Sequence, residues 1–227
     1  LFISPGSTFK PYDYAAFIDN NNAGAGSVFY DTRGALPGYD CTSDDRCLRD
    51  YDRRYPGPVT IRYALGGSRN VPAVKAMLSA VPNDRSQGRI ASINKTIGMT
   101  EEMMGAGDAD SANDDETGKY WCFEQGTDVY DASLDKSYRK AQKVQCGGSA
   151  AIGDGAYLRL IDHATGLSTF PRMGQHIPYT YILKITDSAN KTIDEFKQPA
   201  PKQVIKPDTA YIVNDMLSDR AASYLGS

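Results

Sequence analysis

Residues 5–18 read PGSTFKPYDYAAFI, and this stretch decides how the amino-terminal part of the chain folds. Small hydroxyl residues and Pro11 favour the start of a helix near Ser7. An apolar stripe at helical spacing follows at Tyr14, Ala15, Phe17 and Ile18. Ser7 and Lys10 lie three residues apart and therefore share a helix face, which lets the lysine amine reach the serine hydroxyl. A serine beside such an amine is a candidate nucleophile, although an N-capping serine followed by a solvated lysine would give the same pattern.

A second motif stands in residues 57–77, GPVTIRYALGGSRNVPAVKAM. Thr60 is expected to cap a short helix, Gly66-Gly67 to end it, and Pro72 to begin the next helix. The residues Ser68-Arg69-Asn70 then lie in the turn between the two helices. There the Ser68 hydroxyl can relay a proton, and the Asn70 amide can bind a substrate carbonyl or hold the lysine.

The remaining sequence predicts a mainly helical α+β domain with one β-hairpin. Helical spacing recurs over 86–98, over 154–170 and from Asp208 onward, whereas alternation over 179–197 indicates a hairpin. The segments 27–58 and 100–147 lack a clear period and are interpreted as loop-rich insertions. With 227 residues, 41% of them hydrophobic and 23% charged, the composition is that of a soluble globular domain.

Charge and cysteine content narrow the function classes. A formal net charge of -3 makes nucleic acid an unfavoured partner. The cysteines have no C-x-x-C spacing, so we expect two disulfides, Cys41 with Cys47 and Cys122 with Cys146, in preference to buried thiols or a metal site. The acidic run over 105–116 does not keep an EF-hand pattern and is interpreted as a solvated loop. His163 falls among apolar neighbours and is expected to pack rather than bind a ligand.

Together, the two motifs and their order resemble the transpeptidase domain of penicillin-binding proteins, especially the bifunctional class A type. The resemblance covers the nucleophile helix at 5–18 and the second motif at 57–77. It continues through the segments 152–174, 179–193 and 209–217. The resemblance implies a helix-rich part of the serine β-lactamase/transpeptidase fold, with residues 1–227 as a partial transpeptidase domain and most of the central sheet missing.

Roles in that family carry over to four positions. The resemblance implies that Ser7 is the acylated nucleophile, Lys10 its proton acceptor, Ser68 the proton shuttle and Asn70 the residue that holds the substrate amide. It implies a serine D-Ala-D-Ala transpeptidase that cross-links peptidoglycan stem peptides and is acylated by β-lactams, with no cofactor and no metal. It also implies an extracytoplasmic parent protein, attached to the membrane only through an N-terminal anchor outside this sequence.

One departure from the family is the absence of its third motif, K-T-G followed by Thr or Ser. Lys95-Thr96 is followed by Ile97, and Lys191-Thr192 by Ile193. The corresponding strand supplies a substrate-carboxylate contact and one oxyanion-hole amide in the family, so this chain is expected to be a truncated piece with little or no activity. A D,D-carboxypeptidase, a β-lactamase-like hydrolase or a non-catalytic scaffold module remain alternatives.

Overall fold

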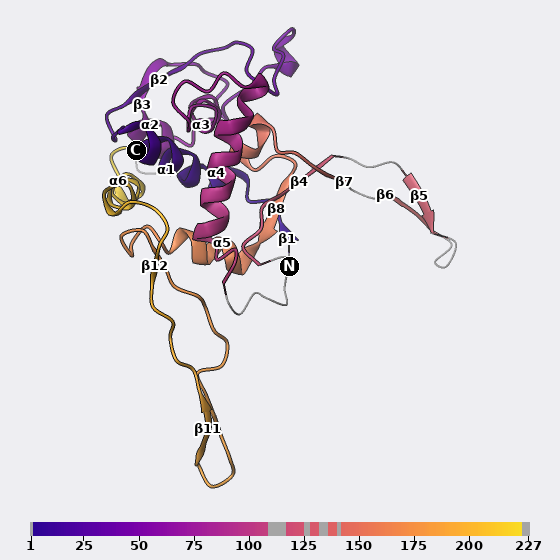
Figure 1. Ribbon diagram of the computed structural model, residues 1–227. Helices are drawn as coiled ribbons and strands as arrows, with labels where there is room; N and C mark the ends of the chain where they lie inside the picture. The colour runs from indigo at the N-terminus through magenta and orange to yellow at the C-terminus, as the bar shows by residue number, and fades with distance from the viewer. Residues whose placement is uncertain (1, 109–116, 125–127, 132–135, 140–141, 224–227) are drawn as a thin grey trace.

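One buried helix organises the fold. The computed structural model describes residues 2–108, 117–124, 128–131, 136–139 and 142–223. Helix α1 (Lys10–Asn21) contacts α2 (Ile61–Gly66), α3 (Asn70–Met77), α4 (Ile90–Met103) and α6 (Pro207–Ser218), so it lies inside the helical body seen in Figure 1. The residues of α1 that are buried are Lys10, Pro11, Tyr12, Asp13, Tyr14, Ala15, Ala16 and Ile18. A helix covered on nearly all sides in this way holds its polar side chains in a fixed place.

The start of this helix agrees with the sequence prediction. A 3-10 turn, η1 (Gly6–Phe9), contains Ser7 and runs directly into α1, with Pro11 at the beginning of the α-helix. Because proline lacks an N–H group, it fits the first turn of a helix, where that group has no intrahelical partner. Pro11 therefore marks the beginning of α1, which places Ser7 in the preceding 3-10 turn and Lys10 at the first position of the helix.

The second motif also adopts the predicted turn. The Thr60 side chain accepts a hydrogen bond from the Tyr63 amide at the start of α2, and the turn 67–69 separates α2 from α3. Ser68 has a φ of 50°, in the left-handed region that non-glycine residues seldom occupy. Asn70 opens α3, two residues earlier than the predicted start at Pro72.

The structure also contains a small antiparallel sheet of four strands. Its order is β1-β8-β4-β7, formed by β1 (Phe2–Ile3), β8 (Ala156–Arg159), β4 (Trp121–Glu124) and β7 (Gln142–Val144). The helix predicted over 154–170 is thus wrong in its first part, since β8 precedes α5 (Leu160–Leu167). Residues 156–159 pair with two strands that are distant in sequence, and a local period does not reveal such pairing.

The segments interpreted as loop-rich contain additional strands. In 27–58, β2 (Val28–Asp31) pairs with β3 (Gly57–Thr60), and a 3-10 turn, η2, spans Asp44–Arg46. In 100–147, α4 continues to Met103, and β5 (Asp128–Asp131) pairs with β6 (Lys136–Arg139) beyond the β4–β7 pair. Figure 1 shows this β5–β6 ribbon extending away from the helical body.

The carboxyl-terminal part matches its sequence pattern closely. Strands β10 (Lys184–Thr186) and β11 (Thr192–Glu195) form the expected hairpin, which projects from the body in Figure 1. The short strands β9 (Gln175–His176) and β12 (Lys202–Gln203) pair near its base, and α6 packs Ala210, Val213 and Met216 into the core. Two further 3-10 turns are η3 (Gln87–Arg89) and η5 (Gly148–Ile152).

Both predicted disulfides are confirmed. Cys41 is bonded to Cys47, and Cys122 in β4 is bonded to Cys146 just after β7. The second bond ties the β4–β7 pair together at its body end. No helix in the described ranges combines the length and the apolar composition that a membrane span requires.

Candidate active site

Ser7 and Lys10 face each other across the turn that opens α1. The Lys10 Nζ atom lies 2.9 Å from Ser7 Oγ, while Lys10 is only 1% exposed and Ser7 is on the surface. An accessible hydroxyl in contact with a buried amine is the arrangement that the S-x-x-K spacing predicted. The hydroxyl can meet a ligand while its neighbouring amine stays away from bulk water.

The second motif completes the surroundings of the lysine. Lys10 Nζ donates to the Ser68 carbonyl oxygen at 2.6 Å and to Asn70 Oδ1 at 2.6 Å, and it lies 3.1 Å from Ser68 Oγ. The structure therefore brings all four predicted residues, Ser7, Lys10, Ser68 and Asn70, to one amine. The left-handed backbone of Ser68 belongs to the turn that presents both its carbonyl and its hydroxyl to Lys10.

These four contacts differ in what they can exchange with the amine. The Ser68 carbonyl and Asn70 Oδ1 can only accept, so they hold two N–H groups of Lys10 in any protonation state. The hydroxyls of Ser7 and Ser68 can either accept or donate. When Lys10 is neutral and its two N–H groups are held in this way, its single lone pair remains for the hydroxyls. It can accept a proton from the hydroxyl of Ser7 or of Ser68, one at a time.

Burial makes the neutral amine accessible near physiological pH. Removal of the ammonium from water lowers the pKa of Lys10 to about 8, and the Arg69 charge acts in the same direction, whereas Asp13 and Asp50 oppose it. An amine with this pKa can act as a proton acceptor at neutral pH, when an ordinary lysine would remain charged.

Asp13 lies one helical turn beyond Lys10 and is completely buried. Neither of its carboxyl oxygens has a hydrogen-bond partner among the described residues. Burial raises the pKa of Asp13 well above its usual range, so the group is favoured in its neutral form. The carboxylate form of Asp13 raises the pKa of Lys10, and burial of Asp13 works against that form.

His163 supports the same turn from α5 rather than acting in the chemistry. Its Nε2 lies 2.9 Å from Thr8 Oγ1, and its Nδ1 lies 3.2 Å from the Tyr12 hydroxyl. Burial lowers the pKa of His163, which favours the neutral ring. The prediction of a packed histidine agrees with this environment.

Asn70 is fully engaged inside the protein. In addition to its contact with Lys10, its Nδ2 donates to the Arg49 carbonyl oxygen at 2.6 Å. Of the two functions considered for this amide, holding the lysine is the one that the geometry displays. Binding of a substrate amide would require Nδ2 to exchange the Arg49 carbonyl for the substrate.

Sequence reasoning missed two charged neighbours of this site. Arg69 is the middle residue of the Ser68-Arg69-Asn70 motif and is 7% exposed, and the buried Asp50 accepts a hydrogen bond from the backbone N–H of Asn70. An arginine between two site residues, with aspartates clustered at 50 and 52, was the available signal. It could not be interpreted without knowing that the segment 31–54 folds back onto the motif.

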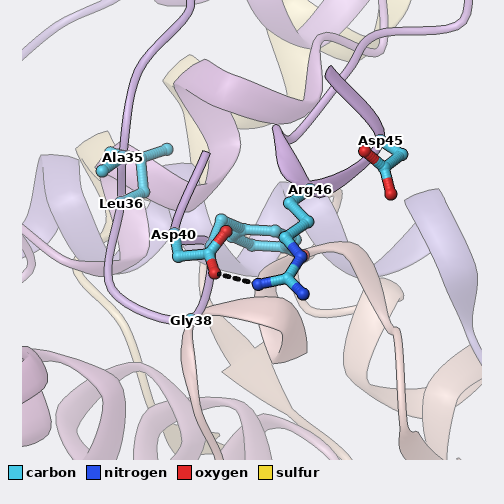
Figure 2. A pocket seen from close by; sticks show the side chains of 7 residues that line it. Ala35, Leu36, Gly38, Asp40, Asp45 and Arg46 are labelled. Carbon is cyan, nitrogen blue, oxygen red and sulfur yellow. Dashed lines mark hydrogen bonds and ion pairs between the residues drawn. The ribbon is translucent and has the colours of Figure 1, made fainter. Parts of the chain in front are cut away.

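An open groove of about 890 Å³ lies elsewhere, on the segment 35–46. Its lining residues are Ala35, Leu36, Gly38, Tyr39, Asp40, Asp45 and Arg46. Figure 2 shows Asp40 and Arg46 facing each other in an ion pair of 3.0 Å across this groove. None of the four predicted site residues lines it.

The acidic run has only one end in the described part of the chain. Asp108 contacts His176 Nε2 at 2.8 Å, while residues 109–116 lie outside the described residues. Within the described ranges, no group of three or more His, Cys, Asp or Glu side chains is arranged to hold a metal ion.

Known proteins resemble this chain in sequence. The family model for the penicillin binding protein transpeptidase domain matches residues 3–226. A penicillin-binding protein 1A/1B of Bacillus subtilis is 41% identical over 73 residues, which are 32% of this chain and 7% of that protein. Penicillin-binding protein 1A of Neisseria gonorrhoeae is 35% identical over 75 residues, which are 33% of this chain and 9% of that protein. The matched stretch is thus a small part of either relative.

Solved structures share the fold over nearly the whole chain. A peptidoglycan synthetase from Bifidobacterium adolescentis aligns with a TM-score of 0.61 at 17% identity, covering 98% of this chain and 34% of that one. Penicillin-binding protein A from M. tuberculosis, as its imipenem acyl-enzyme complex, aligns with a TM-score of 0.67 at 16% identity, covering 100% of this chain and 45% of that one. The chain therefore spans less than half the length of these structures.

Proposed function

Because the chain belongs to the penicillin-binding protein transpeptidase family, we propose that Ser7 is the nucleophile of a serine D-Ala-D-Ala transpeptidase that forms an acyl-enzyme with peptidoglycan stem peptides and with β-lactams. Lys10 is the proton acceptor, Ser68 the proton shuttle and Asn70 the residue that holds Lys10 and the substrate amide. The observation that carries the proposal is the set of contacts of Lys10 Nζ, which lies 2.9 Å from Ser7 Oγ and 3.1 Å from Ser68 Oγ.

Acylation follows from these contacts in three proton transfers, from Ser7 to Lys10, from Lys10 to Ser68 and from Ser68 to the leaving nitrogen. Neutral Lys10 takes the proton of Ser7 Oγ as that oxygen attacks the carbonyl carbon of the penultimate D-Ala. The bond between this carbon and the terminal D-Ala nitrogen then breaks, and the nitrogen receives the proton that Lys10 holds, passed through the Ser68 hydroxyl. Ser7 is left as an ester, and the amine of a neighbouring stem peptide releases it by forming the new amide.

A β-lactam enters the same route through its strained amide. Attack by Ser7 opens the ring and leaves the acyl group on the serine, while the ring nitrogen takes the proton from Ser68. Penicillin-binding protein A from M. tuberculosis has been solved as an acyl-enzyme complex with imipenem, which supports this route for a chain of the same fold.

The rate of this chain should be low. The sequence contains no K-T-G followed by Thr or Ser, and that motif provides an oxyanion-hole amide in the family. Loss of a single oxyanion donor reduces turnover by roughly 10²–10³-fold. We therefore expect acylation by penicillin over minutes to hours rather than seconds.

Intact mass spectrometry with a labelled penicillin at millimolar concentration tests the proposal. We expect one slowly formed adduct, located by peptide mapping on Ser7, and no adduct on Ser7→Ala. Lys10→Ala should slow the labelling by orders of magnitude, because the hydroxyl keeps its place and loses its base. Ser218→Ala, at an exposed serine of α6, is the matched control and should label as the unaltered chain does.

Two outcomes would count against this function. An adduct that persists on Ser7→Ala would identify another nucleophile. Complete absence of an adduct, together with reversible penicillin binding, would favour a non-catalytic binding module, which the missing K-T-G motif also supports. Rapid stoichiometric labelling would show that the third motif is dispensable.

The same proposal includes the compartment of the protein. Cross-linking of stem peptides takes place outside the cytoplasm, and the bonded pairs Cys41–Cys47 and Cys122–Cys146 are of the kind that persists in an oxidising environment. A membrane-anchored parent protein facing the cell wall accounts for both features.

A further inference from the structure

The middle residue of the second motif is the centre of a buried ion cluster. Arg69 Nε lies 2.7 Å from Asp31, Nη1 lies 2.8 Å from Asp52 and Nη2 lies 3.2 Å from Asp50. Nη2 also donates to the Arg54 carbonyl oxygen at 2.5 Å. The side chains of Asp31 and Asp50 are fully buried, and that of Asp52 is 28% exposed. The planar guanidinium is thus held on each of its nitrogens.

All of these partners come from one segment, 31–54, which begins at the end of β2 and includes the disulfide loop. The segment adds two direct contacts to the motif. Asp50 accepts a hydrogen bond from the backbone N–H of Asn70, and the Arg49 carbonyl oxygen accepts one from Asn70 Nδ2. The residues on both sides of Arg69 are the ones that hold Lys10. The segment 31–54 and Lys10 therefore both contact the Ser68-Arg69-Asn70 motif.

This placement has a direct consequence for backbone geometry. Ser68 has a φ of 50°, and its carbonyl oxygen accepts from Lys10 Nζ at 2.6 Å. A non-glycine residue stays in the left-handed region only when its surroundings hold it there. Arg69 is the next residue, and its side chain is the one in this turn that is fixed by ion pairs.

We propose that Arg69 is a positioning residue, whose ion pairs with the segment 31–54 hold the Ser68-Arg69-Asn70 motif against Lys10. The inference rests on the proposed function, because it assigns the segment a part in preparing the base of that reaction. Arg69 does not touch Ser7 or the reacting atoms, and it acts through Ser68 and Asn70. The groups that face Lys10 are Asp13 from its own helix, and Asp50 and Arg69 from the cluster.

Titration of Lys10 in the full chain tests the inference without any acylation. The carbon-13 signal of the Lys10 ε-methylene, assigned by its loss in Lys10→Arg, reports the protonation of the amine. In the unaltered chain the midpoint should lie near pH 8. Arg69→Lys keeps the positive charge but loses the planar guanidinium, which binds three aspartates at once. A change of the Lys10 midpoint in this variant therefore reports a change in the position of the motif and not a change of charge. We expect an upward shift on the order of one pH unit, toward the ordinary value of about 10.4.

Arg62→Lys is the matched control. Arg62 lies on the preceding helix, α2. Its guanidinium forms ion pairs with Asp215 at 2.5 Å and with Asp219 at 2.9 Å, away from Lys10. Loss of this guanidinium should leave the Lys10 midpoint unchanged. An equal shift in Arg62→Lys would show that any lost ion pair loosens the site, and it would overturn the inference.

Asp52→Asn keeps the test decisive if Arg69→Lys does not fold, because Asp52 lies at the exposed rim of the cluster. Removal of a negative charge by itself would lower the pKa of Lys10, whereas a loosened turn raises it, so the two explanations predict opposite signs. A smaller upward shift supports the inference, and an unchanged or downward midpoint in Asp52→Asn overturns it. If the shifts occur but Ser7 is never acylated, the positioning role stands and the proposed function fails.

Discussion

Gly153 lies against Gly6 so closely that a Cβ atom on Gly153 would stand 2.3 Å from the Gly6 nitrogen. Gly153 also has a φ of 68°, and its carbonyl oxygen accepts from Ser4 Oγ at 2.7 Å. The turn that contains Ser7 thus packs against Gly153, a residue nearly 150 positions later in the chain. Close packing of two backbones at this point requires the absence of a side chain.

Gly153→Ala should therefore disturb the site and the fold together. The methyl group meets backbone atoms that cannot rotate away, and overpacking of this kind costs about 1–3 kcal/mol, with roughly 1–2 kcal/mol more for the left-handed backbone. We expect a lower urea midpoint and a slower acylation of Ser7. Gly98→Ala, in helix α4 with no atom within 4 Å of the added methyl, is the control and should be neutral or stabilising. Equal midpoints for Gly153→Ala and the unaltered chain would contradict the expectation.

Local signals explain which parts of this site could be predicted from sequence. Pro11 and Thr60 mark helix starts through their own chemistry, and the motif spacing then brings Ser7 near Lys10. The convergence of Ser68 and Asn70 on that lysine agreed with an expectation that came from family resemblance, since no local rule places two helices 58 residues apart in contact.

Long-range pairing explains what the sequence did not reveal. The strand at 156–159 pairs with Phe2 and Ile3 on one side, and its apolar residues fit a helical period equally well. Arg69 meets Asp31 across 38 residues, so neither residue carries a sign of the other. Such partners become visible only when the segment between them has folded.

The rate of Ser7 acylation should rise with pH. Only the neutral amine of Lys10 can accept the serine proton, and burial lowers the pKa of Lys10 to about 8. Below that value the labelling rate should increase roughly tenfold per pH unit, and above it the rate should level off. Initial rates of adduct formation between pH 6 and pH 9.5, corrected for hydrolysis of the penicillin, measure this. A rate that is flat through this range would show that Lys10 is not the base.

Asn70→Asp provides the comparison for this profile. Asn70 Oδ1 lies 2.6 Å from Lys10 Nζ, and a carboxylate in its place would favour the ammonium. The midpoint of the profile should move to higher pH, and the rate at pH 7 should fall. A profile that keeps its midpoint while its plateau falls would indicate that Asn70 acts on the substrate alone.

The two disulfides should differ in how much they stabilise the fold. Cys122 and Cys146 are separated by 24 residues, and Cys41 and Cys47 by 6. In the chain-entropy model, loss of the Cys122–Cys146 bond costs about 3.5 kcal/mol, and loss of the Cys41–Cys47 bond costs about 2 kcal/mol. Urea unfolding of the double serine variants measures both values. A larger loss from the Cys41–Cys47 pair would mean that the short loop stabilises the native segment 31–54 directly.

Asp13 gives the stability of the protein a pH dependence whose sign can be derived. Its pKa in the folded chain lies well above the usual 3.8, because burial disfavours the carboxylate. Between these two values the folded state holds a proton that the unfolded state has released. The free energy of unfolding must therefore fall as pH rises above about 4, by at most about 1.4 kcal/mol per pH unit from this group.

Asp13→Asn removes the titrating carboxyl and keeps its shape, so its stability relative to the unaltered chain should increase from pH 4.5 to pH 7.5. Urea unfolding at three pH values measures the difference. Asp13→Ala separates titration from packing, because it should show the same change with pH at a lower absolute stability. Parallel curves for all three proteins would mean that Asp13 is ionised in the folded chain. Lys10 would then have a negative neighbour one turn away, which raises the pKa of its amine.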